Sequence, residues 1–312
     1  MTSKIGIERV ASSIPSNRIE TSVQAERLGL SLSDWGDEAG FAQLARRFPG
    51  QGASDLCLAA ALNLFDSEPV EMSEIDCVVV VTQNPDGYGV PHTAAIVQRK
   101  LGISNGCASF DIGLGGSGYI YGLSIVRSFM ESNGLRCGLL FTADPYSRVI
   151  DDADVATALR FGDAGTVTLL TDRPRWMIGC FDFGTSARQG RVMQVRLDLG
   201  GRLHMDAHAV RDFALKHVPG SIDRALKANN LSLEDIDRIV VQQAGRDLLS
   251  DLSQRLGLEA KIQFHAGAYG DTGSSSIPLV LHNNLGATDR RVVISGFGTG
   301  LSWASTILTR TA

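Results

Sequence analysis

The stretch of residues 110–123, FDIGLGGSGYIYGL, constrains the fold more than any other part of the sequence. An apolar segment runs there into small residues and then opens an amphipathic helical run that reaches about Asn133. A strand-to-helix corner of this kind presents a residue to a ligand, because small neighbours allow a sharp turn and the helix start offers free backbone N–H groups. The corner is built like a nucleophile elbow, yet the residue at its apex is a glycine.

Expected strands and helices alternate along the chain on both sides of this corner. Strands are predicted at residues 4–11, 75–81, 107–112, 135–142, 165–171, 236–242, 262–265 and 291–295. Helices are predicted at residues 54–64, 92–101, 118–133, 207–228, 246–256 and 275–284. This alternation indicates a parallel-rich sheet between layers of helices. Residues 20–52 are interpreted as a cap or loop excursion, and residues 172–201 as a connector with one or two antiparallel strands.

The two parts of the chain repeat each other. IDCVVVVTQ in the first part corresponds to IDRIVVQQ in the second, and GLGGSGYIYGL corresponds to AYGDTGSSSIPLVL. A repeated order of elements predicts a duplicated α/β unit, with halves at residues 1–172 and 173–312 and a site where the corners of both halves meet.

Composition and charge exclude several classes of partner. The net charge of -5 offers no basic face for nucleic acid. No uninterrupted apolar run approaches the roughly 20 residues of a membrane helix, and the first residues lack a secretory signal, so a cytoplasmic protein is expected. The five cysteines form no CxxC pair and are interpreted as buried thiols. His204 and His208 have metal-ligand spacing, but no third ligand is evident, so no metal is expected.

Several collinear segments together point to a family. Besides FDIGLGGSGYIYGL, they are PDGYGVPHTAAIVQRKLGI, PYSRVIDDADVATALRFGDAG, MDAHAVRDFA, AYGDTGSSSIP and GFGTGLSWAS. They resemble the thiolase superfamily and, within it, the ketoacyl synthase III branch, which condenses acyl-CoA with malonyl carrier protein. The resemblance implies an α/β fold of thiolase type, a duplicated α-β-α-β-α layered arrangement with two pseudo-symmetric halves.

The chemistry of this family, as the resemblance implies it, needs a cysteine that becomes acylated and a histidine and an asparagine that bind the malonyl thioester carbonyl. The cysteine position falls on Gly116, because the following residues, SGY, match the family's continuation. The histidine position falls on Gln242 in VQQAG, and the asparagine position on Asp271 in YGDT. All three residues therefore differ from the family's pattern.

Each difference has a chemical meaning. Gly116 has no side chain to acylate, although its N–H lies at the helix start, where it can face a carbonyl oxygen. Gln242 has no pKa near neutrality and cannot shuttle protons as histidine does. Asp271, when ionised, would repel a malonyl carboxylate and the enolate that follows. Together these differences argue against decarboxylative condensation.

Other residues remain candidates for the site. The resemblance places the N–H of Thr299, beside Gly298 in the glycine-rich loop, near the acyl oxyanion. Ser117 is either a substitute nucleophile or the serine that the family already has there. Arg246 could contact a phosphate or a carrier protein at the mouth of the site, and Val90 could reach across a dimer interface.

Two further residues have open interpretations. Asp271 is either a general base with a raised pKa or a group that pairs with Gln242 and fills the vacated site. Cys107 is either a reactive thiol or a core thiol.

Two functions follow from this reading. The first is a ketoacyl synthase III-like acyltransferase acting on acyl-CoA or acyl carrier protein thioesters by a non-cysteine route, in a specialised biosynthetic pathway and without a cofactor. In that route the N–H groups of Gly116 and Thr299 polarise the thioester, and Asp271 or Gln242 orients the acceptor. The second is a non-catalytic subunit that pairs with an active synthase. A homodimer or a heterodimer with another ketosynthase-like chain is expected.

Overall fold

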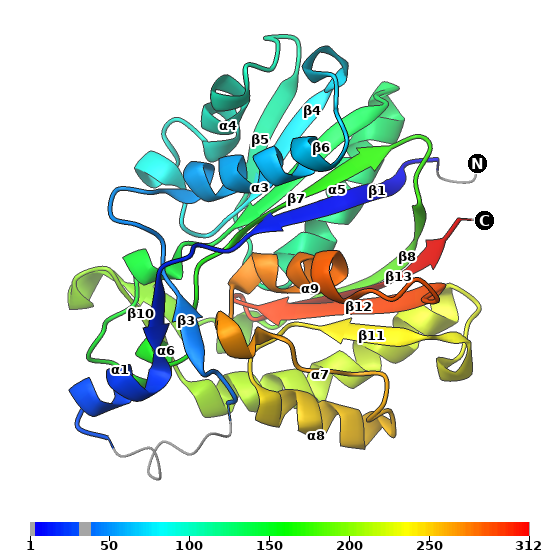
Figure 1. Cartoon of the computed structure of the whole chain (residues 1–312). Helices are drawn as coiled ribbons and strands as arrows, with labels where there is room; N and C mark the ends of the chain where they lie inside the picture. The colour runs from blue at the N-terminus through cyan, green and yellow to red at the C-terminus, as the bar shows by residue number, and fades with distance from the viewer. Residues whose placement is uncertain (1–3, 31–38, 312) are drawn as a thin grey trace.

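A computed structural model describes residues 4–30 and 39–311. Nine of its strands form a single sheet in the order β11-β12-β13-β8-β1-β7-β6-β4-β5 (Figure 1). The strands of one half are β1 (Gly6–Ser13), β4 (Cys77–Val81), β5 (Ala108–Ile112), β6 (Cys137–Ala143) and β7 (Gly165–Thr171). Those of the other are β8 (Trp176–Thr185), β11 (Arg238–Val241), β12 (Arg291–Gly298) and β13 (Ser302–Arg310).

The two half-sheets are joined where β1 lies beside β8. Among the residues placed in the structure, the only residue pair in the ladder between these two strands is Ile7 with Trp176. Within the first half, β4 pairs in parallel with β5 and with β6. Within the second, β11 pairs in parallel with β12. The nine-stranded sheet therefore consists of two half-sheets joined where β1 meets β8.

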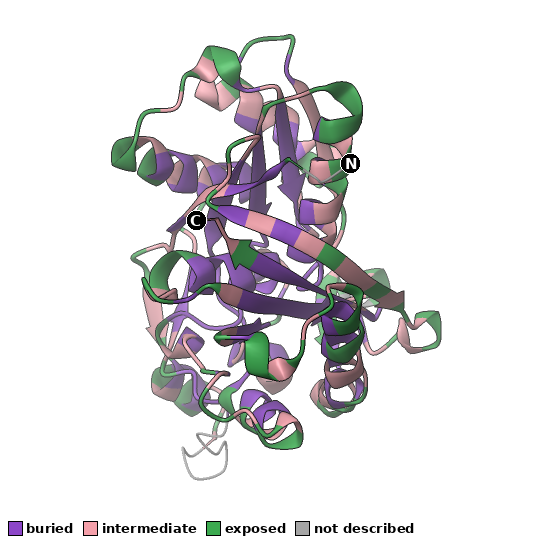
Figure 2. Cartoon of the chain, turned by 90° about the vertical axis from the view of Figure 1, so that its right-hand side faces the viewer, coloured by how far each residue is buried: buried purple, intermediate pink, exposed green. Residues whose placement is uncertain are grey.

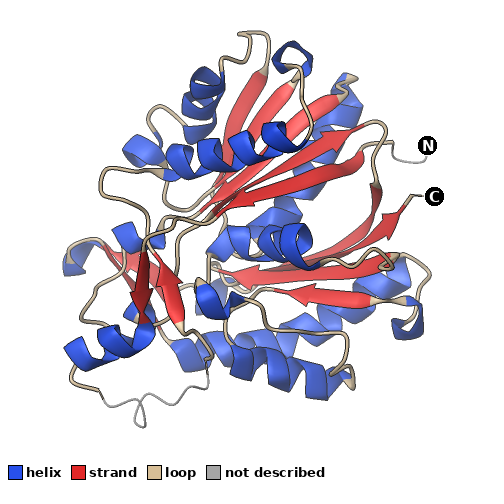
Figure 3. Ribbon diagram, in the orientation of Figure 1, coloured by secondary structure: helices blue, strands red, loops and turns tan. Residues whose placement is uncertain are grey.

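The helices form three layers around the half-sheets. The outer layers hold α3 (Ala53–Ser67) and α4 (Thr93–Leu101) on one side, and α7 (Ala207–Ala228) and α8 (Arg246–Leu256) on the other (Figures 1 and 3). The middle layer holds α5 (Gly118–Asn133) and α9 (Ser276–Asn284), and each of these contacts strands of both half-sheets. The predicted α-β-α-β-α layering is therefore confirmed. The division at residue 172 stays a prediction.

Burial explains this layering. Every residue of β4 is buried, as the β-branched run CVVVV predicts for a strand covered on both faces. The middle helices share one apolar cluster with both half-sheets, in which Tyr119 and Val280 pack with Val79 and Ile294. Figure 2 shows the strands mostly buried, with the exposed residues on the outer helices and loops.

Several elements differ from the sequence-based expectation. Residues 262–265 form no strand; the Ile239 N–H donates to the Lys261 carbonyl at 3.0 Å, and this segment runs as coil. The expected excursion at residues 20–52 contains α1 (Thr21–Arg27) and β3 (Gln43–Ala45), which pairs with β2 (Arg18–Glu20); its residues 31–38 lie outside the described part. The connector contains two antiparallel strands as expected, β8 and β9 (Met193–Arg196), and β9 pairs with β10 (Arg202–Met205), which begins just after the connector.

Candidate functional site

The corner at residues 110–123 lies where β5 ends and α5 begins. Its glycines let the helix approach the sheet closely: a Cβ on Gly118 would lie 2.6 Å from Val81 Cγ1, and one on Gly122 would lie 3.0 Å from Val81 Cγ2. Larger residues there would push α5 away from β4. This close packing fixes the position of Gly116 at the edge of the sheet.

No side chain fits at Gly116 in this structure. A Cβ built there would lie 2.7 Å from Gln242 Oε1 and would collide with the Phe297 carbonyl oxygen, which belongs to β12. The second contact involves backbone, which moves less readily than a flexible side chain. The position that the resemblance assigns to a nucleophile therefore has no side chain, and neighbouring atoms fill the space that a side chain would need.

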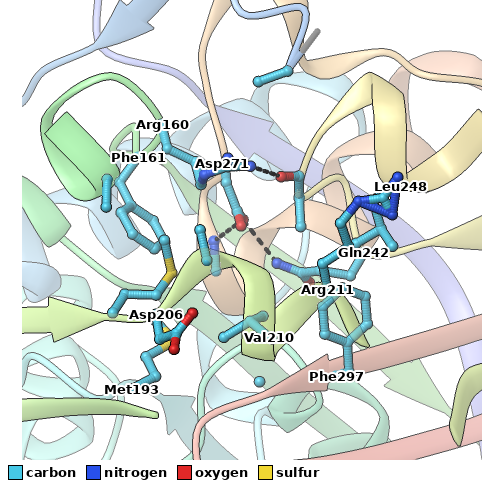
Figure 4. A pocket seen from close by; sticks show the side chains of 18 of the residues that line it. Arg160, Phe161, Met193, Asp206, Val210, Arg211, Gln242, Leu248, Asp271 and Phe297 are labelled. Carbon is cyan, nitrogen blue, oxygen red and sulfur yellow. Dashed lines mark hydrogen bonds between the residues drawn. The ribbon is translucent and has the colours of Figure 1, made fainter. Parts of the chain in front are cut away.

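Gln242 and Asp271 form a pair directly beside Gly116. Gln242 Nε2 donates to Asp271 Oδ1 at 2.7 Å, and the Gly273 N–H donates to the same oxygen at 3.0 Å (Figure 4). This arrangement turns Gln242 Oε1 toward Gly116, where it is buried and has no hydrogen-bond partner. Among the described residues, none donates to Asp271 Oδ2 either. The pair therefore holds two acceptor oxygens without a donor among the described residues, and Gln242 Oε1 is buried against Gly116.

The environment of Asp271 changes its acidity. Burial raises the pKa of this carboxyl to about 6, against the opposing effects of the Gly273 N–H, the Arg160 charge and the Gln242 amide. The backbone also holds the residue in place, since the Asp271 N–H donates to the Arg160 carbonyl at 2.9 Å. A carboxyl with this pKa is mostly ionised at neutral pH and can still accept and release a proton.

Arg160 lies on the same side of the site as Asp271, and the sequence analysis gave it no role. Its Nη1 donates to the Ala244 carbonyl at 2.6 Å, while its Nε is buried without a partner. Burial lowers the pKa of this guanidinium, and the charges of Asp247 and Asp271 raise it. The only signal in the sequence is a charged residue directly before the turn FGDAG.

These residues open into one cavity of about 790 Å³. Its walls carry apolar and charged groups together, among them Gly116, Tyr146, Arg160, Phe161, Met193, Met205, Asp206, His208, Val210, Arg211, Gln242, Asp247, Leu248, Asp271, Phe297, Gly298 and Thr299. Figure 4 shows Met193, Val210 and Phe297 below the Asp271–Gln242 pair. A cavity of this size holds a small molecule or the arm of a larger cofactor.

The backbone at the inner end of the cavity offers donors. Gly116 and Thr299 both line the cavity, and neither N–H donates to another residue in the described ranges. Two unengaged N–H groups in a partly buried site suit a carbonyl oxygen or the oxyanion that forms from it. The cavity lining thus includes backbone N–H groups without a partner among the residues described, as well as the Asp271 carboxyl.

Comparison with known proteins identifies the family. The family described as 3-oxoacyl-[acyl-carrier-protein] synthase III matches residues 110–187, and its C-terminal part matches residues 226–310. A β-ketoacyl-[acyl-carrier-protein] synthase III of Lactococcus lactis is 31% identical over 278 residues, covering 83% of this chain and 85% of the relative. One from Streptococcus agalactiae is 34% identical over 272 residues, covering 82% and 84%.

This chain belongs to the 3-oxoacyl-[acyl-carrier-protein] synthase III family.

Solved structures of synthase III proteins agree with this assignment. The β-ketoacyl-[acyl carrier protein] synthase III of Thermus thermophilus is 27% identical and superposes with a TM-score of 0.90, covering 98% of this chain and 99% of that one. The synthase III of Pseudomonas aeruginosa is 26% identical, also with a TM-score of 0.90, covering 99% and 98%. The thiolase-like fold predicted from the sequence is thus shown.

Several residues that the sequence analysis singled out lie apart from the cavity described above. Ser117 is fully buried, and its Oγ lies 2.8 Å from Ser302 Oγ. Cys107 directly precedes β5, at the opposite end of that strand from the corner, and burial raises the pKa of its thiol to about 11, which opposes the reactive role. His204 lies on β10, so it does not share a helix with His208.

Two predicted binding residues lie at the surface. Val90 is 83% exposed and does not line the cavity of its own chain. Arg246 begins α8, and its guanidinium lies 5.5 Å from the Phe264 ring centroid. Roles for Val90 at a dimer interface and for Arg246 at a phosphate or carrier protein stay predictions.

The sequence analysis did not predict a set of hydrogen-bonded polar side chains that contact Thr299. The Gln83 N–H donates to Asp144 Oδ1 at 2.7 Å, its side-chain amide donates to Thr299 Oγ1, and the Tyr146 hydroxyl donates to Gln83 Oε1 at 3.4 Å. Asp144 also accepts from the Ser274 N–H at 2.9 Å, which ties the two halves together. These contacts fix Thr299 from behind, and no motif in the sequence indicates them.

No helix in the placed parts of the chain has the length and apolar character needed to cross a membrane.

Proposed function

We propose that this synthase III family member is an acyltransferase that moves an acyl group from an acyl-CoA or acyl carrier protein thioester directly to a bound acceptor. The observation that carries the proposal is the closed space at Gly116, where Gln242 Oε1 and the Phe297 carbonyl occupy the position of any side chain. The unengaged N–H groups of Gly116 and Thr299 support thioester activation, and the buried Asp271 carboxyl supports acceptor activation.

The proposed step balances as follows. The N–H groups of Gly116 and Thr299 hold the thioester carbonyl oxygen. The acceptor, written X–H, attacks the carbonyl carbon as its proton moves to an ionised Asp271 oxygen. The carbon–sulfur bond then breaks, and the departing thiolate takes that proton, leaving the acylated acceptor and a free thiol. No acyl-enzyme forms, and no cofactor is needed beyond the CoA or phosphopantetheine part of the substrate.

The names of the relatives support the class of substrate. Those of Lactococcus and Streptococcus are named for acyl carrier protein, and that substrate class comes to this chain by family membership. The polar side chains of Asp206, His208 and Arg211 line the cavity and offer contacts to a polar arm. The proposal places the protein in fatty-acid or polyketide-type biosynthesis, in a specialised route, in the cytoplasm and as a homodimer or heterodimer.

The proposal is tested by acceptor-dependent thiol release. The purified chain is incubated with a panel of acyl-CoAs, with and without a mixture of amines and alcohols, and free CoA is measured. Release is expected only when an acceptor is present, and Asp271→Asn should abolish it. Asp223→Asn is the matched control, since Asp223 pairs with Lys227 on the exposed face of α7. Unchanged CoA release by Asp271→Asn would show that Asp271 takes no part in the reaction and only fills the site.

A second candidate function is a non-catalytic subunit of a heteromeric ketosynthase. The closed position at Gly116 and the exposed Val90 favour it. The same assay separates the two functions. If CoA is released only after a second synthase-like chain is added, the acyltransferase proposal is wrong and the subunit function is supported.

A further inference from the structure

The side chain of Gln83 lies between the two segments that carry the unengaged N–H groups. Its amide nitrogen donates to Thr299 Oγ1. Its amide oxygen lies against the corner, since a Cβ built on Gly115 would be 2.5 Å from Gln83 Oε1. The two segments are adjacent, because a Cβ on Gly298 would lie 2.7 Å from the Gly116 N atom. Gln83 itself does not line the cavity, so it acts on a bound molecule through these segments.

Other contacts hold Gln83 in one place. It follows β4 by two residues, and its N–H donates to Asp144 Oδ1 at 2.7 Å. Asp144 is fully buried and also accepts from the Ser274 N–H at 2.9 Å. The Tyr146 hydroxyl donates to Gln83 Oε1 at 3.4 Å, while the other end of the amide donates to Thr299. These contacts fix both the backbone and the amide of Gln83.

The position of Thr299 in the chain explains why such a contact matters. Thr299 lies between Gly298 and Gly300, and glycine gives the backbone on either side little conformational preference of its own. The Thr299 carbonyl accepts from Ser302 Oγ at 2.9 Å, which holds the peptide that follows the residue. The hydroxyl contact with Gln83 holds the residue itself, and with it the direction of its N–H.

We propose that Gln83 is a positioning residue for acyl transfer, which holds the Thr299 N–H in place beside the Gly116 N–H. In the proposed reaction these two groups bind the thioester oxygen, and a donor stabilises the oxyanion only when it points at that oxygen. The oxyanion carries more charge than the carbonyl, so a displaced donor weakens the transition state more than the bound substrate. This inference rests on the proposed function and adds a residue to it.

Gln83→Leu tests this role, because leucine is similar in size and can neither donate to Thr299 nor accept from Tyr146. CoA release from acetyl-CoA is measured with an acceptor that the native protein uses. We expect kcat to fall by about tenfold or more while KM for acetyl-CoA stays within about twofold. Gln98→Leu is the matched control, since Gln98 Nε2 donates to the Ser104 carbonyl at 2.8 Å on α4, away from the cavity. Its kcat should be unchanged.

A second variant disturbs the same contact from the other side. A Cβ at Gly115 displaces the Gln83 amide and leaves Gln83 itself in the chain, so Gly115→Ala should also lower kcat by about tenfold with KM nearly unchanged. Gly113→Ala has open space around its Cβ and should keep the native kcat. The free energy of unfolding is measured for every variant, so that a loss of fold is not mistaken for a loss of rate.

The outcomes separate this inference from the proposed function. An unchanged kcat in Gln83→Leu, with the native protein active, would overturn the inference and leave the acyltransferase proposal standing. A rise in KM that accounts for the whole loss would overturn it as well, because Gln83 would then affect substrate binding alone. Absence of CoA release by the native protein with every acceptor would contradict both. If Gln83→Leu fails to fold, the comparison of Gly115→Ala with Gly113→Ala decides the matter.

Discussion

At the scale of single residues, the site depends on Asp271. A carboxyl with two donors on one oxygen, none from the described residues on the other and a raised pKa combines the features of a general base. The sequence left two interpretations of Asp271 open, a general base or a partner of Gln242, and the structure shows the hydrogen bond between these two side chains. The sequence did not predict Arg160 or the tilt of Gln242 over Gly116, because these depend on contacts between segments far apart in the chain.

The pKa of Asp271 predicts a pH dependence of turnover. The carboxyl must be ionised to accept a proton, so the rate of CoA release should rise with pH through about 6 and then level off. The measurement is kcat/KM between pH 5 and pH 8 with the acceptor in excess. A flat profile over this range would show that Asp271 takes no proton.

The same shift predicts a change in stability for Asp271→Asn. The folded-state pKa is raised above its unfolded value, so ionisation opposes folding, and the native aspartate loses stability as the pH rises through about 6. The free energy of unfolding of Asp271→Asn should exceed that of the native protein by about 2 to 3 kcal/mol at pH 8, and the difference should vanish below about pH 4. Urea denaturation at both pH values measures it. A variant that is less stable at pH 8 would contradict this account.

Gly116 gives a prediction about packing. Gly116→Ala should lower the free energy of unfolding by about 1 to 3 kcal/mol, since its Cβ collides with the Phe297 carbonyl. Gly113→Ala, in the same corner, has open space around its Cβ and should change stability by less than about 0.5 kcal/mol. Equal effects of the two substitutions would show that the closed space at Gly116 is unimportant for folding.

At the scale of elements, the turn FGDAG links the cavity to the rest of the fold. Asp163 is fully buried; its Oδ1 accepts from the Ser147 N–H at 3.0 Å and its Oδ2 from the Arg47 N–H at 2.8 Å. Gly162 is two residues after Arg160 in the sequence, and its N–H donates to the Asp271 carbonyl at 2.8 Å. The turn therefore positions both charged residues of the site.

This arrangement predicts a large effect of Asp163→Ala. Two backbone donors lose their buried partner, so the free energy of unfolding should fall by about 2 to 4 kcal/mol. Asp172→Ala, which breaks a partly exposed ion pair with Arg136, should cost less than about 1 kcal/mol. Thermal unfolding of both variants measures the difference. Similar losses would mean that the turn is held by other contacts.

Elements could be predicted from the sequence where one pattern ran long enough. The buried run CVVVV and the amphipathic residues 207–228 gave correct elements, because burial on both faces and a helical period are visible locally. The expected strand at residues 262–265 was wrong, since a few apolar residues beside β11 suit coil as well as strand. Strand β13 was missed although it forms a hairpin with β12, because the two strands are joined by a glycine-rich loop and the other neighbour of β13, β8, is distant in the sequence.

At the scale of the whole molecule, the duplicated architecture determines where the site lies. The middle helices α5 and α9 begin near the ends of strands in different half-sheets, so Gly116 of one half meets Gln242 and Asp271 of the other. The internal repeat in the sequence predicted this meeting point. The repeat could not predict that Phe297 of β12 and Gln242 fill the space beside Gly116, because that depends on how closely β12 approaches the corner.

The most direct test of acyl transfer without an acyl-enzyme is a single-turnover reaction followed by intact-protein mass spectrometry. Protein in excess over acetyl-CoA is mixed with an acceptor that gave CoA release and quenched over time, and protein mass, CoA and the acetylated acceptor are measured together. We predict that CoA and product appear at the same rate while the protein mass never increases by an acetyl group. An acetylated protein that forms and decays at the rate of turnover would contradict the account.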